Sequence, residues 1–182
     1  ASLNQILRYG YGDWAGSERE VKRALQLDPN NAGAHTTYAH YLLAMGKYSE
    51  AVAEMKLARE IEPLNLRANA LEGQFLIYTG QIDEALSRFQ KTFELDPNFW
   101  FAHLFASSAY IDKGMFAEAA AEARKAKELS GSTFPNSFLG YALAKLGHKA
   151  EAESVLEDLL KQSRERYIPA YHIALIYNGL GK

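Results

Sequence analysis

The sequence has no cysteine in its 182 residues, which excludes disulfide bonds and metal sites built on thiolates. It also has little net charge, −2, because 20 Lys and Arg residues stand against 22 Asp and Glu residues. No run of basic residues occurs of the kind that binds nucleic acid or anionic lipid. We therefore expect neither a nucleic acid nor a membrane among the partners.

Long apolar runs are missing as well. The longest uncharged stretches, such as residues 97–111, are too short to cross a bilayer and contain polar residues. Residues 1–5 show no basic stretch followed by an apolar run, so no signal peptide is predicted. With 48% hydrophobic and 23% charged residues, the composition is that of a folded protein. We expect the protein to be soluble and cytoplasmic.

What the sequence does contain is a repeat marked by glycine. Glycines lie at positions 12, 46, 80, 114, 147 and 181, at intervals of 34, 34, 34, 33 and 34 residues. A second marker, Asp28-Pro29, recurs as Glu62-Pro63 and Asp96-Pro97 in step with the first. Two independent markers in the same register indicate a repeat protein.

Both markers have a structural meaning. Glycine is favoured where a helix ends in the left-handed conformation. Proline disfavours helical geometry at the residue before it and suits the first turn of the next helix. Between the markers, apolar residues recur at helical spacing, as in Ala85, Phe89 and Phe93. Each period is therefore predicted to be helix A, a tight turn, helix B and a second tight turn.

Small residues recur at two positions where these helices would pack. Five residues after the glycines stand Ser17, Ala51, Ala85, Ala119 and Ala152. Seven residues before the glycines stand Ala39, Gly73, Ser107, Gly140 and Ala174. Small side chains at these positions would let two helices approach closely, and a bulky replacement would overpack the contact.

The 34-residue period, the small–Gly–x–x–x–Glu–Ala pattern and the Asp-Pro ending resemble the tetratricopeptide repeat family over essentially the whole chain. The chain departs from the family where helix A often carries an early Trp, since His35, Asn69, His103, Asn136 and Ala170 stand there. Glu72 occupies a position where a large apolar residue is usual, and the fourth repeat ends without its proline.

The resemblance implies an all-α fold, a right-handed superhelical α-solenoid of antiparallel helix pairs with about five repeats and a partial one. We expect a single array over residues 1–182. Its repeats are predicted at residues 1–31 (partial), 32–65, 66–99, 100–132, 133–166 and 167–182 (partial).

The two ends of the chain resemble a narrower group. Residues 141–147 and 166–177, and residues 13–18 with 23–25, are similar to the C-terminal repeat region of certain bacterial signalling proteins. In those proteins the repeats follow a serine/threonine kinase, an adenylate cyclase or a winged-helix DNA-binding domain. This resemblance implies an alternative function, that of a regulatory or sensory segment of a larger bacterial protein.

No residue pattern indicates catalysis, a cofactor or a metal. His35 and His40 are five residues apart and so lie on different helix faces, whereas metal-binding histidine pairs are four apart. The other histidines have no local partner at ligand spacing, and we interpret all five as groove or packing residues. Neither a nucleophile elbow nor a phosphate-binding loop occurs. We predict that the chain is not an enzyme.

The resemblance places the binding surface on helix A, which lines the concave side of the array in this family. Carried over position by position, it gives these groove candidates: Thr37, His40, Gln74, Tyr78, Phe101, Phe105, Ser108, Phe134, Phe138, Tyr141, Tyr171 and His172. Their mostly aromatic and apolar character favours a partner helix or extended segment with large side chains. An RNA-binding helical repeat would need polar groove positions and positive charge, which argues against that class.

The last helix, roughly residues 169–180, is predicted to have no helix B after it. We expect either that the chain is a piece of a longer array or that a second copy covers the apolar face. A homodimer would then form through Ile173, Ile176 and Tyr177.

Overall fold

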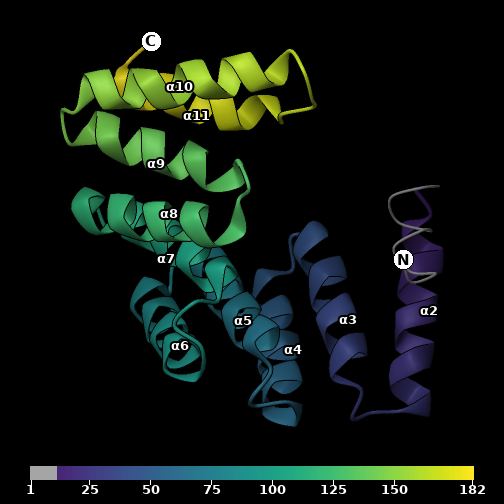
Figure 1. The fold of residues 1–182 in the computed structure, drawn as a ribbon. Helices are drawn as coiled ribbons and strands as arrows, with labels where there is room; N and C mark the ends of the chain where they lie inside the picture. The colour runs from purple at the N-terminus through teal and green to yellow at the C-terminus, as the bar shows by residue number, and fades with distance from the viewer. Residues whose placement is uncertain (1–11) are drawn as a thin grey trace. The chain divides into compact units, whose positions relative to one another are not determined.

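The computed structural model describes residues 12–182, and all the regular structure in that range is α-helical (Figure 1). The beginning of the predicted partial repeat at residues 1–31, residues 1–11, lies outside the described residues. The helices are α2 (Trp14–Leu27), α3 (Ala32–Ala44), α4 (Tyr48–Ile61), α5 (Leu66–Tyr78), α6 (Ile82–Leu95), α7 (Trp100–Asp112), α8 (Phe116–Ser130), α9 (Phe134–Lys145), α10 (Lys149–Ser163) and α11 (Ala170–Leu180). The predicted all-α fold of paired helices is confirmed.

Five of the six repeat glycines follow a described helix A and form the turn after it, as predicted. Gly46 has a φ of 74° and Gly80 a φ of 76°, and the other four also have positive φ. After each of the five glycines from Gly46 onward, the next residue donates its backbone N–H to a carbonyl of the preceding helix, for example Lys47 to Leu42 at 2.9 Å. This is the Schellman arrangement, in which the turn supplies donors for carbonyls that the helix leaves unpaired.

Two of the turns from helix B to helix A use asparagine two residues after the proline. The Asn31 side chain accepts a hydrogen bond from the backbone N–H of Ala34 at 2.9 Å, and Asn65 accepts one from Ala68 at 3.1 Å. These side chains cap α3 and α5 at their N-termini. Where the fourth repeat lacks its proline, Gly131 ends α8 in the left-handed conformation with a φ of 60°.

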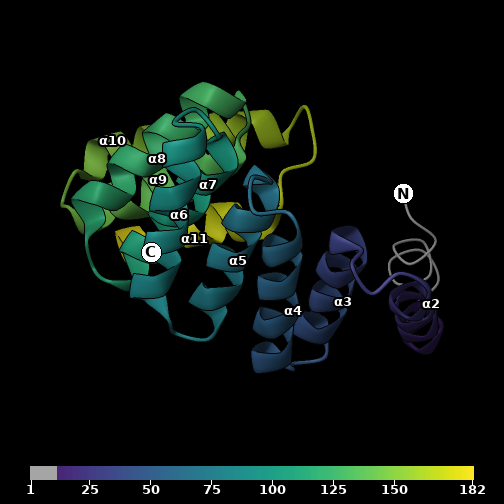
Figure 2. The ribbon, with the colours of Figure 1, turned by 90° about the horizontal axis from the view of Figure 1, so that it is seen from below.

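The chain forms two compact units, residues 1–88 and residues 89–182, which divide within α6. In the first unit α3 contacts both α2 and α4, and α4 contacts α5. The pair α3 and α4 lies side by side in both ribbon views (Figures 1 and 2). In the second unit α8 contacts α7 and α9, and α9 contacts α10 and α11. Helix α9 therefore packs both on its own helix B and on the next helix A.

The small residues lie where the sequence predicts close helix contacts. Five residues after the glycines, all five side chains are fully buried: Ser17, Ala51, Ala85, Ala119 and Ala152. Seven residues before the glycines, Ala39, Gly73, Ser107 and Gly140 are also buried, whereas Ala174 is exposed. Ala174 differs because no described helix follows α11 to cover it.

Candidate functional site

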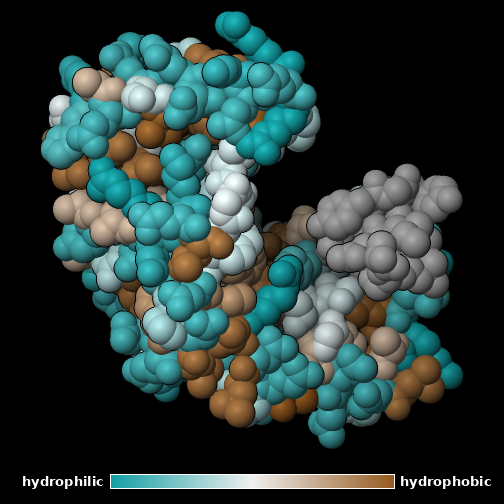
Figure 3. Space-filling view, viewed as in Figure 1, coloured by the Kyte–Doolittle hydropathy of each residue, from teal (hydrophilic) through white to brown (hydrophobic). Residues whose placement is uncertain are grey.

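Charge is distributed unequally between the two helices of each repeat. The A helices α3, α5, α7, α9 and α11 together hold only four charged residues: Arg67, Glu72, Asp112 and Lys145. The B helix α4 alone holds five, and the visible face of the B helix α10 is mostly hydrophilic (Figure 3). A ligand that lies on the A helices therefore meets a nearly uncharged surface.

In the first unit the predicted groove residues are mainly polar. Thr37 and His40 on α3 are partly buried, and each bonds a backbone carbonyl of its own helix, Thr37 that of Gly33 at 2.8 Å. On α5, Gln74 donates to the hydroxyl of Tyr78 at 3.1 Å, and Tyr78 is 50% exposed. His40 also meets Phe75 edge-on, with ring centroids 5.1 Å apart. These contacts hold the side chains in defined positions.

In the second unit the corresponding face is aromatic. On α7 the ring of Phe101 meets that of Phe105 edge-on, with centroids 4.6 Å apart. Phe101 and Ser108 are partly exposed, but Phe105 is only 7% exposed and offers little ring surface to a partner. On α9 the partly buried Tyr141 lies under Lys145, whose ammonium is 5.3 Å from the ring centroid.

The first turns of α9 and α11 bring four rings together. Phe134 stacks on His172 with centroids 4.8 Å apart and planes inclined by 14°. Phe138 lies 5.9 Å from Phe134, and Tyr171 meets His172 edge-on at 4.3 Å. Tyr171 is 52% exposed, whereas His172 is 6% exposed and its Nδ1 has no hydrogen-bond partner. Burial lowers the pKa of His172, so the imidazole is held neutral within an aromatic cluster.

Two glycines bring α9 and α11 close together beyond this cluster. A Cβ added to Gly140 would lie 2.7 Å from Cδ1 of Ile176, and one added to Gly179 would lie 3.1 Å from Cα of Tyr141. The C-terminal halves of the two helices are thus in close contact. At the N-terminal ends of α9 and α11, the stacked rings of Phe134 and His172 occupy the space between the helices.

The predicted dimer surface on α11 needs a correction. Ile176 is 0% exposed because it packs against Leu156, Leu159 and Ile168 and fills the space above Gly140. It is therefore not available to a second copy. Ile173 and Tyr177 are partly exposed, and a dimer through these two residues stays a prediction.

Sequence reasoning missed two groups of ionisable side chains. Glu72 is 2% exposed and lies 2.9 Å from Nε of Arg59 on α4 and 3.3 Å from Nε of Arg88 on α6. His35 Nδ1 lies 2.6 Å from Glu54, and its Nε2 lies 2.9 Å from the carbonyl of Pro29. The sequence carried a signal for the group around Glu72, because a charged residue stands there at a repeat position that is usually apolar.

The group around His35 recurs 68 residues later in the sequence, and this repetition is the signal that could have revealed it. His103 lies 2.5 Å from Glu122 and 2.9 Å from the carbonyl of Pro97, in the same geometry as the first pair. Burial disfavours the charged imidazole of His103, but hydrogen bonds to Glu122 and Pro97 outweigh it and raise its pKa. Each of these histidines joins helix A to the following helix B and to the preceding turn.

Residues 12–182 hold no cluster of three or more His, Asp or Glu side chains arranged to bind a metal ion. Within the same range, no helix combines the length and the apolar character that a membrane span requires.

Two family models, both described as tetratricopeptide repeat, match residues 9–75 and 71–132. Together they cover residues 9–132, more than half of the chain. No curated protein matches the chain.

Solved structures with the same fold are numerous. PilW, titled a widely conserved type IV pilus biogenesis factor, is 21% identical with a TM-score of 0.82, over 98% of this chain and 83% of that one. TTC0263 of Thermus thermophilus, titled a thermophilic TPR protein, is 19% identical with a TM-score of 0.78, over 96% and 94%. A fragment of MamA from Desulfovibrio magneticus RS-1 is 17% identical with a TM-score of 0.72, over 91% and 94%. At these identities the likeness establishes the fold alone.

Proposed function

Because the chain belongs to the tetratricopeptide repeat family, we propose that it is a non-enzymatic protein-interaction scaffold whose second unit binds a partner through its aromatic A-helix face. The binding segment would be a helix or an extended strand with large apolar side chains. We define the aromatic face as Phe101, Phe134, Phe138, Tyr141 and Tyr171. The predicted cytoplasmic location and the expected absence of nucleic-acid and membrane partners stay predictions.

The observation that carries this proposal is a set of partly exposed rings on helices with almost no charge. All five rings of the aromatic face retain exposed surface, and α9 and α11 contain Lys145 as their only charged residue. Contacts within the unit already fix ring positions, such as Phe134 against His172. A partner side chain that docks there buries apolar area while the protein loses little side-chain freedom.

The experiment is a display selection of random peptides on the full chain, followed by calorimetry with an enriched peptide. We expect enrichment of segments with two or more large apolar residues. Replacing Phe138 and Tyr171 by Ala should weaken binding at least about tenfold, since each ring contributes roughly 1 kcal/mol or more at an interface. Helicity should stay largely unchanged because Tyr171 is half exposed and Phe138 lies only at the edge of the buried core.

The matched control is Tyr48→Ala, which removes an aromatic ring of similar exposure, 48%, from the B helix α4. It should leave affinity unchanged. The proposal fails if the enriched peptides are mainly charged, or if the Tyr48→Ala variant and the Phe138→Ala, Tyr171→Ala double variant lose affinity equally.

A further inference from the structure

One negative charge lies beside the aromatic face of the second unit, at the C-terminal end of α7. Phe101, Phe105, Ser108 and Asp112 follow one another at intervals of four, three and four residues. This spacing aligns side chains along one side of a helix. The rings of Phe101 and Phe105 are in contact, with centroids 4.6 Å apart. The exposed Asp112 therefore continues this row at the end of the helix.

The helix α9, which contacts α7, carries a row of the same spacing. Its members are Phe134, Phe138, Tyr141 and Lys145. The ammonium of Lys145 lies 5.3 Å from the centroid of the Tyr141 ring, and it stands at a helix C-terminus, where the helix dipole favours a positive charge. The charge of Lys145 is thus already stabilised within the chain.

The charge of Asp112 is not stabilised in this way. A carboxylate at the C-terminal end of a helix meets the negative end of the helix dipole, and α7 has no basic residue in its last turn. Desolvation raises the pKa of Asp112. Within the described residues, its carboxylate has neither a hydrogen bond nor an ion pair. The ionised side chain is therefore less stable at this position than in water.

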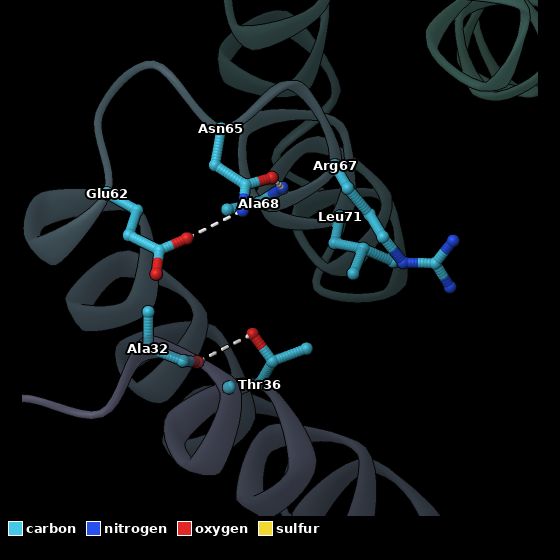
Figure 4. A pocket seen from close by; sticks show the side chains of 8 residues that line it. Ala32, Thr36, Glu62, Asn65, Arg67, Ala68 and Leu71 are labelled. Atoms are coloured by element: carbon cyan, nitrogen blue, oxygen red, sulfur yellow. Dashed lines mark hydrogen bonds between the residues drawn. The ribbon is translucent and has the colours of Figure 1, made fainter. Parts of the chain in front are cut away.

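The first unit does not share this arrangement. The corresponding row of α5 has its charge at the N-terminal end: Arg67, Leu71, Gln74 and Tyr78. Figure 4 shows Arg67 beside a pocket between α3 and α5, with its guanidinium pointing away from the other lining residues. The corresponding rows of α3 and α11 contain no Asp or Glu. Among the described A helices, a row that ends in a negative charge is found on α7 alone.

We propose that Asp112 binds a lysine or arginine of the partner segment, so that the second unit selects segments in which a basic residue stands beside large apolar residues. This inference rests on the proposed function, because the rings would hold the apolar residues of the same segment. A partner cation would supply the positive charge that the last turn of α7 lacks. An acidic segment would be repelled, which adds selectivity.

The chemistry of a basic side chain suits this position. Lysine and arginine can lay their apolar stems along apolar surface while the charged group reaches a carboxylate. The row on α7 offers that sequence of surfaces, from the rings of Phe101 and Phe105 to the carboxylate of Asp112. Side chains that oppose a local preference without compensation are expected at functional sites.

The first test measures the free chain. Asp112→Asn should raise the midpoint of urea unfolding at pH 7, because it removes a negative charge from the negative end of α7. The control is Asp158→Asn, which removes an exposed carboxylate before the last turn of α10 and should shift the midpoint less. If Asp112→Asn does not raise the midpoint above that of the control, the charge is already compensated within the chain and the inference is overturned.

The second test repeats the display selection of random peptides on the full chain in three forms: wild type, Asp112→Lys and Asp158→Lys. The wild type and Asp158→Lys should both enrich segments with a Lys or Arg beside large apolar residues. Asp112→Lys should keep the apolar residues and replace the basic residue by Asp or Glu, because the charge that it meets is reversed.

The third test measures the pairing itself by calorimetry. The probe is the most enriched wild-type peptide, synthesised with its basic residue and with Met in its place. The basic peptide should bind the wild type about fivefold or more tightly than the Met peptide, and Asp112→Asn should abolish that difference. An equal difference on both proteins overturns the inference.

The selection also distinguishes failure of this inference from failure of the proposed function. Apolar segments enriched without a basic residue overturn the role of Asp112 and leave the aromatic face as the binding surface. The same holds if Asp112→Lys enriches the same basic residue as the wild type. A selection that enriches no apolar segments overturns both proposals.

Discussion

His103 and Glu122 face each other between α7 and α8, with Nδ1 of the imidazole 2.5 Å from Oε2 of the carboxylate. Because Nε2 also lies 2.9 Å from the carbonyl of Pro97, both ring nitrogens meet an acceptor. A carbonyl and an ionised carboxylate only accept, so both nitrogens donate when the ring is protonated. The pair therefore favours the imidazolium form, in agreement with the raised pKa of His103.

This geometry predicts a pH-dependent contribution to stability. The raised pKa of folded His103 means that the contribution is fully present below the unfolded value of about 6.5 and is lost as the pH rises through the folded value. His103→Asn should remove this dependence because an amide side chain does not titrate. The bond to the turn should persist, since Asn69 at the equivalent position bonds the carbonyl of Pro63 at 2.9 Å. Urea unfolding at pH 6 and pH 9 measures the difference, which we expect to be about 1–2 kcal/mol.

The control for that variant is His148→Asn. His148 lies 3.0 Å from Glu151, but both side chains are more than half exposed, so the pair contributes little. Equal pH dependence in the two variants would refute the assigned role of His103.

His172 predicts the opposite dependence. Burial lowers the pKa of His172 in the folded state. Above a pH of about 6.5 the ring is neutral in both states, and as the pH drops toward the folded pKa the unfolded state binds a proton first, so the stability falls. His172→Phe restores the residue found at the equivalent positions Phe105 and Phe138. This variant should be more stable than the wild type at pH 5 and should lose less stability between pH 7 and pH 5. A larger acid loss in the variant would contradict the prediction.

The buried carboxylate of Glu72 should be costly to remove alone. Glu72→Leu leaves Arg59 and Arg88 facing an apolar side chain, and loss of one partner of a buried ion pair costs about 3–5 kcal/mol. We expect about 2–3 kcal/mol here, because the two arginine side chains are 17% and 20% exposed and can turn toward water. Thermal unfolding monitored by circular dichroism measures this.

Replacing all three members should behave differently. Arg59→Leu and Arg88→Met combined with Glu72→Leu leave no buried charge, and the stability should return to within about 1 kcal/mol of the wild type or exceed it. If the triple variant is less stable than Glu72→Leu, the two arginines stabilise the fold by more than their pairing with Glu72.

Gly140 should tolerate a side chain only when Ile176 is reduced. Gly140→Ala places a Cβ 2.7 Å from Cδ1 of Ile176, and overpacking of this kind costs about 1–3 kcal/mol. In an Ile176→Ala background the same change should be neutral or stabilising, because Ala favours the helix over Gly by up to about 1 kcal/mol. A double-mutant cycle by denaturant unfolding gives the coupling, and strictly additive effects would argue against the contact.

The sequence predicted the repeat architecture because backbone chemistry dictates it. Gly46 and its equivalents must take a left-handed conformation, and Ala51 and its equivalents must fit between helices. Such requirements recur at every repeat and are visible as a period. The helix pairs, the turns and the buried small residues all followed from it.

The candidate site was less accessible to sequence reasoning because it depends on which side chains cover which. The sequence named these aromatic residues as candidates, but their periodic positions did not distinguish Phe105, which is buried, from Tyr171, which is half exposed. Ile176 was expected on an open face because the space above Gly140 that it fills is a property of the packed pair.

The turn at Gly131 bears on how such an array tolerates changes in chain length. The repeat that ends there is one residue shorter than its neighbours, yet α9 still meets α8 and α10 as the earlier helices meet theirs. A second left-handed glycine lies between helix B and the next helix A, where the linker has three residues in place of four, α8 is one residue longer than α4, and α9 is one residue shorter than α7. Insertions and deletions at these junctions should therefore accumulate during evolution more readily than at the Gly46-type turns, where a hydrogen bond fixes the loop length.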